Sequence, residues 1–298
     1  MTQKEILFFT PDNKTYIWGS ERWTISAHSH GDVKVNGGRF DGMALSQLYK
    51  EHPELFGKEK GDSQAFPLLV KIISANDDLS IQVHPDNEYA SLNENGSLGK
   101  TECWYILDCD KDAELVLGHN AKDINELNEM VSNNRFSSLI KSVAVKKGDF
   151  IQINPGTVHA IKGGITLLEI QQSSDITYRL YDYDRLDNGK PRPLHLKQAI
   201  DVIHCPAPPL SDSMITKRTI SENQMNRLIS CDFYTIREMK VVKEARIEQV
   251  HNFMIVCVVN GSGFVGDKEI KAGSHFIIPC GFGEVIFIGD MEVVLAVS

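Results

Sequence analysis

Short apolar runs separated by Gly, Asn and Asp dominate the hydrophobic pattern of this chain. We expect strands at 68–73, 79–84, 102–107, 150–153, 165–171, 233–239, 253–259, 275–278 and 285–288. Helical spacing of apolar residues occurs in three stretches, 43–56, 121–140 and 194–204. Many short strands with few helices predict a mainly β protein, an antiparallel sandwich or barrel with short helical insertions.

A weak internal repeat refines this picture. Residues 148–159 (GDFIQINPGTVH) and 273–284 (GSHFIIPCGFGE) both place a strand between two glycines that are eight positions apart. Two such units predict two related β-barrels. The first unit ends in His159 and the second in Glu284, so the first is equipped for chemistry and the second is structural.

Prolines mark the expected boundary between the two barrels. The stretch CPAPPL at 205–210 does not support a helix or a strand. We therefore predict a catalytic, metal-binding domain over 1–205 and a second, metal-free domain over 206–298.

Composition narrows the class of partner. The chain has 298 residues, 42% hydrophobic and 24% charged, and a net charge of -9. This balance is globular and argues against nucleic acid or an anionic membrane as the main partner, so an anionic ligand needs a local basic cluster. No apolar run reaches the roughly 18 residues of a membrane helix, and the six cysteines form no CxxC pair. We expect reduced thiols and a cytoplasmic location.

Four residues in the first half combine into a candidate metal site. Gln82 and His84 alternate with apolar residues and share one strand face, Glu102 begins a strand beside two bulky apolar side chains, and His159 follows a tight turn. Each has an ordinary explanation when it is taken alone: a wet strand face, a carboxylate at an exposed strand mouth, a histidine satisfied in the core. Together, one amide, two imidazoles and one carboxylate suit zinc, with iron or manganese as alternatives, and favour an open catalytic site.

The stretch 169–193 is the second concentration of functional groups. Glu169 and Gln171 share a strand face, and Arg179 and Arg185 lie among tyrosines and aspartates. A guanidinium binds phosphate or an enediolate through two parallel hydrogen bonds. A charged surface hairpin is the alternative explanation. Lys100, just ahead of Glu102, is a further cation near the same site.

Several of these stretches resemble the type I phosphomannose isomerases, also called mannose-6-phosphate isomerases, especially their short bacterial form. The matching pieces are YIWGSERWTIS, IQVHPDNEYA, GKTECWYILD, GDFIQINPGTVHAI, LEIQQSSDITYRLYDYDR and KPRPLH. The family belongs to the cupins, so the resemblance implies two cupin-type jelly-roll barrels. It implies one zinc ion per chain, bound by Gln82, His84, Glu102 and His159.

The resemblance also implies a reaction and its remaining site residues. Arg179 is expected to be catalytic, and Lys100 and Glu169 to bind substrate. The reaction interconverts mannose 6-phosphate and fructose 6-phosphate through an enediol. The sequence leaves the general base open among Glu169, His84 and a zinc-bound water. It also leaves open which of Lys100, Arg179 and Arg185 holds the phosphate.

Two other functions are compatible with the same residues. One is another metal-dependent cupin enzyme, such as an Fe(II) oxygenase that uses two histidines and one carboxylate. The other is a non-catalytic cupin that senses sugars, although the chain shows no basic helix-turn-helix signal. The amide of Gln82 and the neighbouring cations favour a sugar phosphate over oxygen chemistry.

Overall fold

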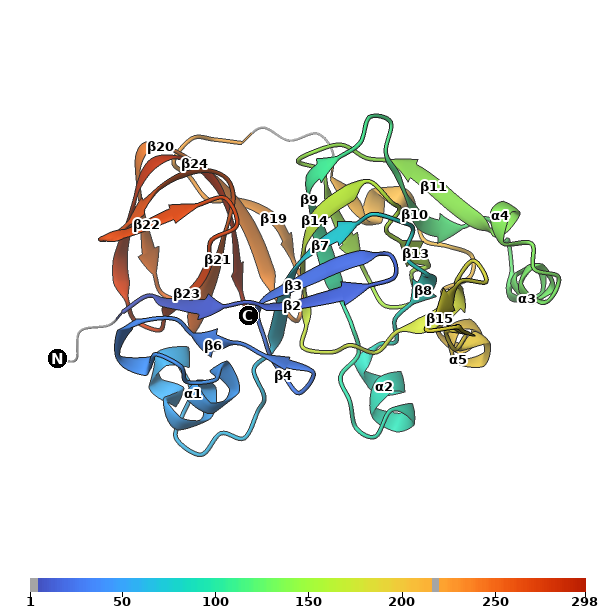
Figure 1. The fold of residues 1–298 in the computed structure, drawn as a ribbon, viewed down its shortest axis with the longest axis horizontal. Helices are drawn as coiled ribbons and strands as arrows, with labels where there is room; N and C mark the ends of the chain where they lie inside the picture. Colours follow the sequence, from blue (N-terminus) through green and yellow to red (C-terminus); the bar gives the residue numbers. More distant parts are fainter. Residues whose placement is uncertain (1–4, 216–219) are drawn as a thin grey trace. The chain divides into compact units, whose positions relative to one another are not determined.

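The computed structural model describes residues 5–215 and 220–298, which are mainly β-strand (Figure 1). Their contacts divide the chain into two compact units. The first, here called the site unit, contains residues 13–22 and 71–215. The second, here called the C-terminal unit, contains residues 5–12, 23–70 and 220–298. No helix in the described part of the chain is long and apolar enough to cross a membrane.

The C-terminal unit contains an eight-stranded antiparallel sheet with the order β19-β20-β24-β21-β23-β1-β6, and β22 pairs with β21. The strands β4 and β5 form a separate pair. The bounds are β1 (Leu7–Thr10), β4 (Ala27–His28), β5 (Gly31–Asp32), β6 (Lys34–Val35), β19 (Asn226–Ser230), β20 (Thr235–Gln249), β21 (Phe253–Val265), β22 (Lys268–Lys271), β23 (His275–Pro279) and β24 (Gly283–Val297). Along β24 buried and exposed side chains alternate, so Val285 and Phe287 enter an entirely apolar cluster while Glu284 and Ile288 face outward.

The site unit is built on two antiparallel sheets. One has the order β11-β10-β13-β8-β15, the other the order β18-β12-β9-β14-β7-β3-β2, and β16 pairs with β17. The bounds are β2 (Asp12–Tyr16), β3 (Gly19–Ile25), β7 (Leu68–Ala75), β8 (Ile81–Val83), β9 (Glu102–Cys109), β10 (Glu114–His119), β11 (Ile140–Ala144), β12 (Phe150–Ile153), β13 (His159–Ala160), β14 (Ile165–Gln172), β15 (Tyr178–Tyr181), β16 (Leu186–Asp187), β17 (Lys190–Pro191) and β18 (Met214–Ile215). The strands β2, β3 and β7 have residues in both units.

Short helices fill the places where the sequence predicted helical insertions. Their bounds are η1 (Gly38–Phe40), α1 (Leu45–Glu51), η2 (Pro53–Phe56), α2 (Asn87–Asn93), α3 (Ile124–Ser132), α4 (Phe136–Leu139), α5 (Leu196–Val202) and η3 (Leu210–Asp212). The stretch 43–56 divides into α1 and η2 at Pro53, because proline cannot continue a helix. Helix α2 was not predicted; the Asp86 side chain caps it by accepting a hydrogen bond from the Tyr89 N–H at 2.8 Å.

The helices of the site unit cover one face of the sheet that contains β8 and make that face apolar. Apolar residues of α3, α4 and α5 pack in one cluster with Ile81 and Val83 of β8. Because strand side chains alternate, Gln82 and His84 must then point to the opposite face, between the two sheets. The interior on that side is apolar at one end, around Ile106 and Leu167, and polar where Glu102 and Glu169 enter.

The fold confirms the mainly β prediction, with one difference. Within the described residues the sheets do not close into hydrogen-bonded barrels, since each has free edge strands. Contacts also group the chain differently from the predicted segments 1–205 and 206–298, because β1 pairs with β23 (Leu7↔Ile277). The functional division into a catalytic and a metal-free domain at this boundary stays a prediction.

Candidate metal centre and its surroundings

Three short strands of the site unit carry the predicted ligands to one place. Gln82 lies in β8 opposite His159, the first residue of β13, and His84 follows β8. Glu102 is the first residue of β9 and pairs with Ile153 of β12 on the other sheet. The two sheets therefore bring residues that are 77 positions apart, Gln82 and His159, to the same interior point as Glu102.

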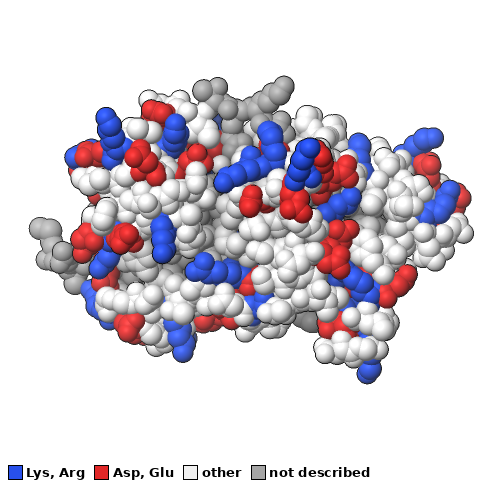
Figure 2. Space-filling model, turned by 45° about the horizontal axis from the view of Figure 1, so that its top comes forward, with Lys and Arg blue, Asp and Glu red and all other residues white. Residues whose placement is uncertain are grey.

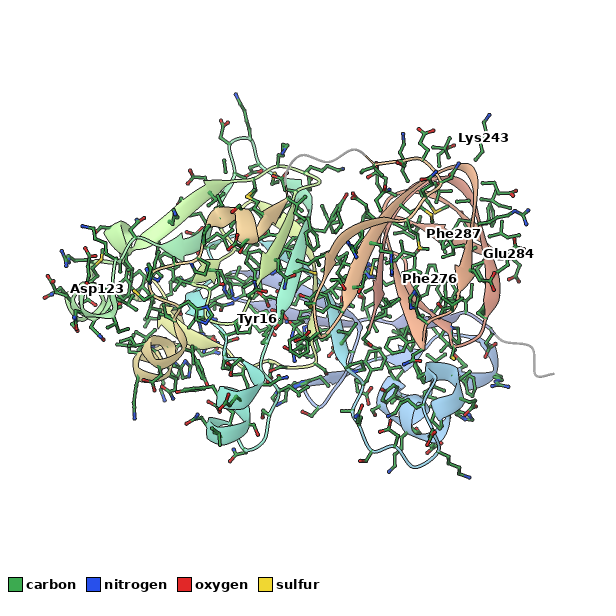
Figure 3. All side chains as sticks on the ribbon, turned by 180° about the vertical axis from the view of Figure 1, so that it is seen from behind. Tyr16, Asp123, Lys243, Phe276, Glu284 and Phe287 are labelled. Carbon is green, nitrogen blue, oxygen red and sulfur yellow. The ribbon has the colours of Figure 1, made fainter. Side chains whose placement is uncertain are left out.

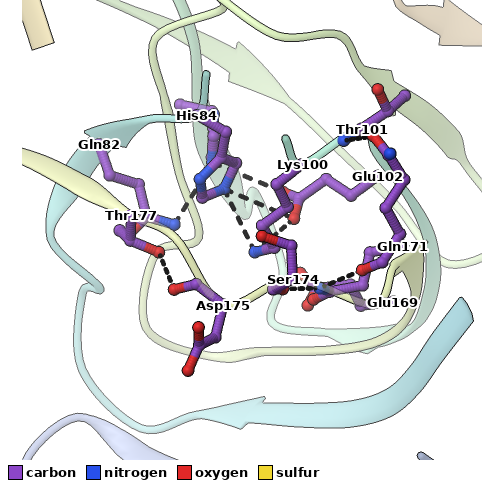
Figure 4. A network of polar contacts seen from close by, with 12 residues as sticks. Gln82, His84, Lys100, Thr101, Glu102, Glu169, Gln171, Ser174, Asp175 and Thr177 are labelled. Atoms are coloured by element: carbon purple, nitrogen blue, oxygen red, sulfur yellow. Dashed lines mark hydrogen bonds and ion pairs between the residues drawn. The ribbon is translucent and has the colours of Figure 1, made fainter. Parts of the chain in front are cut away.

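The side chains of His84, Glu102 and His159 converge within coordination range of a shared point. One ligand atom from each lies within 4.8 Å of the others. Glu102 Oε2 is 3.6 Å from His84 Nε2, and Glu102 Oε1 is 3.5 Å from His159 Nε2. All three side chains are completely buried. Figure 4 shows His84 and Glu102 turned toward each other beside Lys100.

Each imidazole is held by a backbone carbonyl. His84 Nδ1–H donates to Ile176 O at 2.8 Å, and His159 Nδ1–H donates to Thr157 O at 2.9 Å. Both Nε2 atoms then carry a lone pair toward Glu102, which is the arrangement of metal-binding histidines. Burial lowers the pKa of His84 to about 4, with Lys100 adding to the effect and Glu102 opposing it. Burial likewise lowers the pKa of His159, so both rings stay neutral ligands at pH 7.

The Glu102 carboxylate also fits a bound cation. Burial by itself would raise its pKa, but Lys100 and the two histidines outweigh that effect and hold the pKa well below its ordinary value. Neither oxygen accepts a well-oriented hydrogen bond from a described residue. Lys100 Nζ, 2.7 Å from Oε2, compensates that oxygen, whereas Oε1 has no hydrogen-bond partner among the described residues, which is costly in a buried carboxylate unless a further cation faces it. The donor set and this unsatisfied group therefore fit a divalent metal ion.

Gln82 lies beside this cluster. Its Nε2–H donates to His159 Nε2 at 3.3 Å, and its Oε1 accepts from Ser80 Oγ at 3.2 Å. Since the oxygen and nitrogen of an amide are assigned from the hydrogen-bond network, a half-turn of the group presents the oxygen to the same point. The structure thus puts Gln82 next to the candidate ligands, and its role as the fourth ligand stays a prediction.

Lys100 is part of the same buried group. Its Nζ is 2.7 Å from Glu102 Oε2 and 3.2 Å from His84 Nε2. The predicted substrate-binding lysine therefore contacts the candidate ligands directly. Its ammonium supplies a charged hydrogen-bond donor beside the candidate ligands.

Glu169 lies one residue pair farther along the same interior face. In the pairing of β14 with β9, Gln171 faces Glu102 and Glu169 faces Trp104. Glu169 Oε2 accepts from Trp104 Nε1 at 3.0 Å, and Oε1 is 3.1 Å from Lys71 Nζ. Glu169 is therefore near the candidate ligands and is not one of them.

Sequence analysis did not identify Lys71. Its side chain is only 6% exposed, and its Nζ lies between Glu169 and Glu21. Burial by itself would lower the pKa of Lys71, but the two carboxylates raise it above its ordinary value. The available signal was a single lysine inside the apolar run LLVKII, where an unpaired charge would be costly.

Arg179 lies in β15 directly opposite Gln82. Its Nε is buried and has no hydrogen-bond partner in the described part of the chain. Arg185 differs, since its Nε, Nη1 and Nη2 contact Asp182 O, Asp77 Oδ2 and Asp182 Oδ1. Of the two arginines that the sequence suggested, Arg179 is the one without a carboxylate partner among residues 5–215 and 220–298.

Comparison with known proteins identifies the family. A model described as phosphomannose isomerase type I, catalytic domain, matches residues 9–117, and one described as mannose-6-phosphate isomerase, cupin domain, matches residues 224–298. Mannose-6-phosphate isomerase ManA of Bacillus subtilis is 42% identical, covering 98% of each chain. The chain belongs to the mannose-6-phosphate isomerase family.

Further relatives support the same family. The mannose-6-phosphate isomerase of Streptococcus mutans is 40% identical over 99% of this chain and 92% of the relative. The crystal structure of mannose 6-phosphate isomerase from Bacillus subtilis matches with a TM-score of 0.88 at 36% identity, covering 98% of this chain and 99% of the other. A mannose 6-phosphate isomerase bound with zinc and yttrium shares the fold, with a TM-score of 0.79 at 13% identity over 98% of this chain and 99% of the other. The predicted type I family and cupin fold are confirmed.

Proposed function

We propose that this chain is a zinc-dependent mannose-6-phosphate isomerase that interconverts mannose 6-phosphate and fructose 6-phosphate. The observation that carries the proposal is the buried His84–Glu102–His159 cluster inside a chain of this family. The cluster offers neutral nitrogen and charged oxygen donors without a thiolate, which suits zinc in a catalytic site. A structural relative bound with zinc supports the choice of metal.

We propose His84, Glu102, His159 and Gln82 as the ligands of one zinc ion per chain. A bound divalent ion supplies Lewis acidity, which lowers the cost of negative charge on the substrate oxygens at C1 and C2. The two backbone carbonyls at His84 and His159 fix the ring orientations before any ligand binds. The apolar layer behind β8 keeps water away from the other side of the ligands.

Glu169 is the proton acceptor we propose for the carbon acid. His84 is excluded as the base, because its Nδ1–H is donated to Ile176 O and its Nε2 faces Glu102 and Lys100. Glu169 keeps acceptor capacity beyond its contacts with Trp104 and Lys71, since a carboxylate has about four lone-pair sites. Its place next to the ligand strand puts it on the face that a bound sugar would meet.

The developing enediolate charge is assigned to Lys100 and Arg179. Lys100 already lies at the ligand cluster, and Arg179 has a guanidinium without a carboxylate partner within ion-pair distance in the described residues. Donors that are fixed before the reaction stabilise such charge without reorganisation. The substrate class that these groups fit is a phosphorylated aldose.

The location proposed for the enzyme is the cytoplasm. All six cysteines are described and none forms a disulfide. Thiols persist in a reducing compartment, which supports this prediction.

The test combines metal analysis with a coupled assay on mannose 6-phosphate. We expect one zinc per chain and formation of fructose 6-phosphate, both lost after chelation and restored by zinc. The matched control is Glu102→Gln, which keeps the shape of the side chain and removes its charge. Oxygen consumption without isomerisation would favour an Fe(II) oxygenase, and binding of the sugar phosphate without turnover would favour a sensor; either result contradicts the proposal.

A further inference from the structure

The segment KPRPLH, which the candidate centre leaves unused, returns to Arg179. The hairpin of β16 and β17 carries the chain back, and the His195 N–H donates to Arg179 O at 2.8 Å. In the other direction, the Arg179 N–H donates to His195 Nδ1 at 3.2 Å. Both backbone groups of Arg179 are thereby fixed by one residue at the end of this segment.

The same segment delivers a second guanidinium to a buried carboxylate. Asp182 is only 4% exposed, and Arg192 donates to it through Nε at 2.7 Å and through Nη2 at 2.5 Å. Burial alone would raise the pKa of Asp182, but Arg192 and Arg185 outweigh it and lower the pKa. Such a bidentate pair fixes the plane of the guanidinium as well as its position.

The carboxylate that holds Arg192 comes only three positions after Arg179 in the chain. Burial lowers the pKa of Arg179, and the positive charge of Arg192 lowers it further, while Asp182 opposes the effect. Arg192 uses Nε and Nη2 on Asp182, and its Nη1 contacts no polar group among residues 5–215 and 220–298. Arg179 Nε is likewise unpartnered there. In the described part of the chain, each of the two guanidiniums therefore keeps a donor that can serve a ligand.

Two guanidiniums, of Arg185 and Arg192, pair with Asp182, and the only other carboxylate that pairs with either of them in the described part of the chain is Asp77. Arg179 adds a third positive charge to the same segment of the chain. The site unit therefore gathers positive charge here, although the chain has a net charge of -9. On the face drawn in Figure 2, acidic and basic side chains are interspersed. A dianion is thus attracted by this local cluster and not by the overall field.

We propose that Arg192 receives the phosphate of the substrate, and that Asp182 is the positioning residue that holds the Arg192 guanidinium in place for it. The proposal rests on the proposed function, because it assigns the phosphate end of the same ligand. It leaves Lys100 and Arg179 for the sugar oxygens and makes Arg192 the group that selects phosphorylated sugars. Without Asp182, repulsion between the two guanidiniums would drive Arg192 away.

The experiment compares Arg192→Gln with Lys190→Gln. Lys190 is exposed on the same hairpin, so its replacement removes the same charge two residues away. For Arg192→Gln we expect the KM for mannose 6-phosphate to rise about tenfold or more, the size expected for lost charge-assisted hydrogen bonds, with kcat changed less than about threefold. The inhibition constant of inorganic phosphate should rise in parallel and the metal content should stay the same.

Two further variants keep the test decisive. Asp182→Asn should raise KM and the phosphate inhibition constant together, because it frees Arg192 without changing its charge. If Arg192→Gln does not fold, Arg192→Lys is the alternative variant. Lysine keeps the positive charge but cannot form the two parallel hydrogen bonds of a guanidinium, so phosphate binding should still weaken. An unchanged phosphate inhibition constant in folded Arg192 variants, or an equal change in Lys190→Gln, would overturn the proposal.

The experiment can distinguish failure of the proposed isomerase function from failure of the proposed phosphate site. If the wild-type protein does not isomerise mannose 6-phosphate, calorimetric titration with inorganic phosphate still measures the anion site. Weaker phosphate binding in Arg192→Gln than in Lys190→Gln would then support Arg192 as the phosphate ligand even though the protein is not the isomerase. Equal binding in both variants would overturn it.

Discussion

The two units repeat one backbone pattern with opposite interiors. Gly148 and Gly273 precede equivalent strands with φ of 85° and 87°, and Gly156 and Gly281 follow them with φ of 79° and 58°. These are left-handed conformations that favour glycine. The repeat in the sequence therefore records a shared turn geometry.

The chemistry at the end of each repeat differs completely. His159 is fully buried and joins the candidate ligands, whereas Glu284 pairs with exposed Arg246 at 3.1 Å. Figure 3 shows Glu284 at the outer edge of the C-terminal unit, with Phe276 and Phe287 inside it. The same strand framework thus carries either buried polar side chains or an apolar cluster, depending on which side chains point inward.

We expect the largest loss of activity when a candidate metal ligand is removed. Glu102→Ala and His159→Ala each remove a ligand, so metal and activity should be lost together, with activity falling by at least about 10³-fold. Metal analysis and the isomerase assay on the same samples test this. Either variant retaining a full metal complement and wild-type turnover would contradict the assigned ligand set.

An alanine substitution in the apolar core of the C-terminal unit should lower stability without affecting metal binding. Phe287→Ala empties a fully buried site and should lower the free energy of unfolding by about 3–5 kcal/mol, without changing the metal content of the folded protein. Denaturant unfolding measures the effect. The neighbouring Ile288→Ala is the control, because Ile288 is 47% exposed and its loss should cost little. Metal loss from folded Phe287→Ala would show that the two interiors are not independent.

Arg179→Ala separates charge stabilisation from metal binding. We expect the metal to remain and the barrier to rise by about 2.7–4 kcal/mol, the usual cost of one preorganised donor. Steady-state kinetics with metal analysis measures both. Arg246→Ala, an exposed arginine of the other unit, serves as the control. Full activity in Arg179→Ala would refute its catalytic role.

A buried histidine of the site unit should make stability depend on pH. Burial lowers the pKa of His119, and Lys141 lowers it further, against the opposing His204 carbonyl. The unfolded chain therefore takes up the proton first, so stability should fall as the pH drops below about 6.5. His119→Gln keeps a donor for His204 O and should flatten part of that slope in thermal unfolding between pH 7.5 and 5. A slope identical in His119→Gln and wild type would count against this assignment.

The smallest effect is expected at the position equivalent to His159. Glu284→Ala removes an exposed ion pair that solvent screens, so unfolding, metal content and turnover should not change measurably. Loss of activity in this variant would mean that the C-terminal unit takes part in chemistry.

Sequence patterns predicted the candidate metal ligands better than the charged residues that surround them. The alternation around Gln82 and His84 indicated which side chains share a face, and the structure places both next to Glu102 and His159. Lys71 and Arg192 were missed. Lys71 lies inside an apolar run and Arg192 in a proline-rich hairpin, and the acidic partner of each can be identified only from the folded structure. The stretch 121–140 forms α3 and α4, whose apolar side packs with Ile81 and Val83.

By itself, the sequence determined the strand periodicity, the glycine-framed turns and the chemical types of the ligands, since these depend on neighbours a few residues apart. Only the tertiary structure decided that Glu169 pairs with Lys71, that Arg185 pairs with two aspartates, and that Arg179 Nε has no hydrogen-bond partner in the described part of the chain. The physical reason is that a charge enters a folded interior only with a compensating partner. That partner comes from another strand, whose register is fixed by the packing of both sheets.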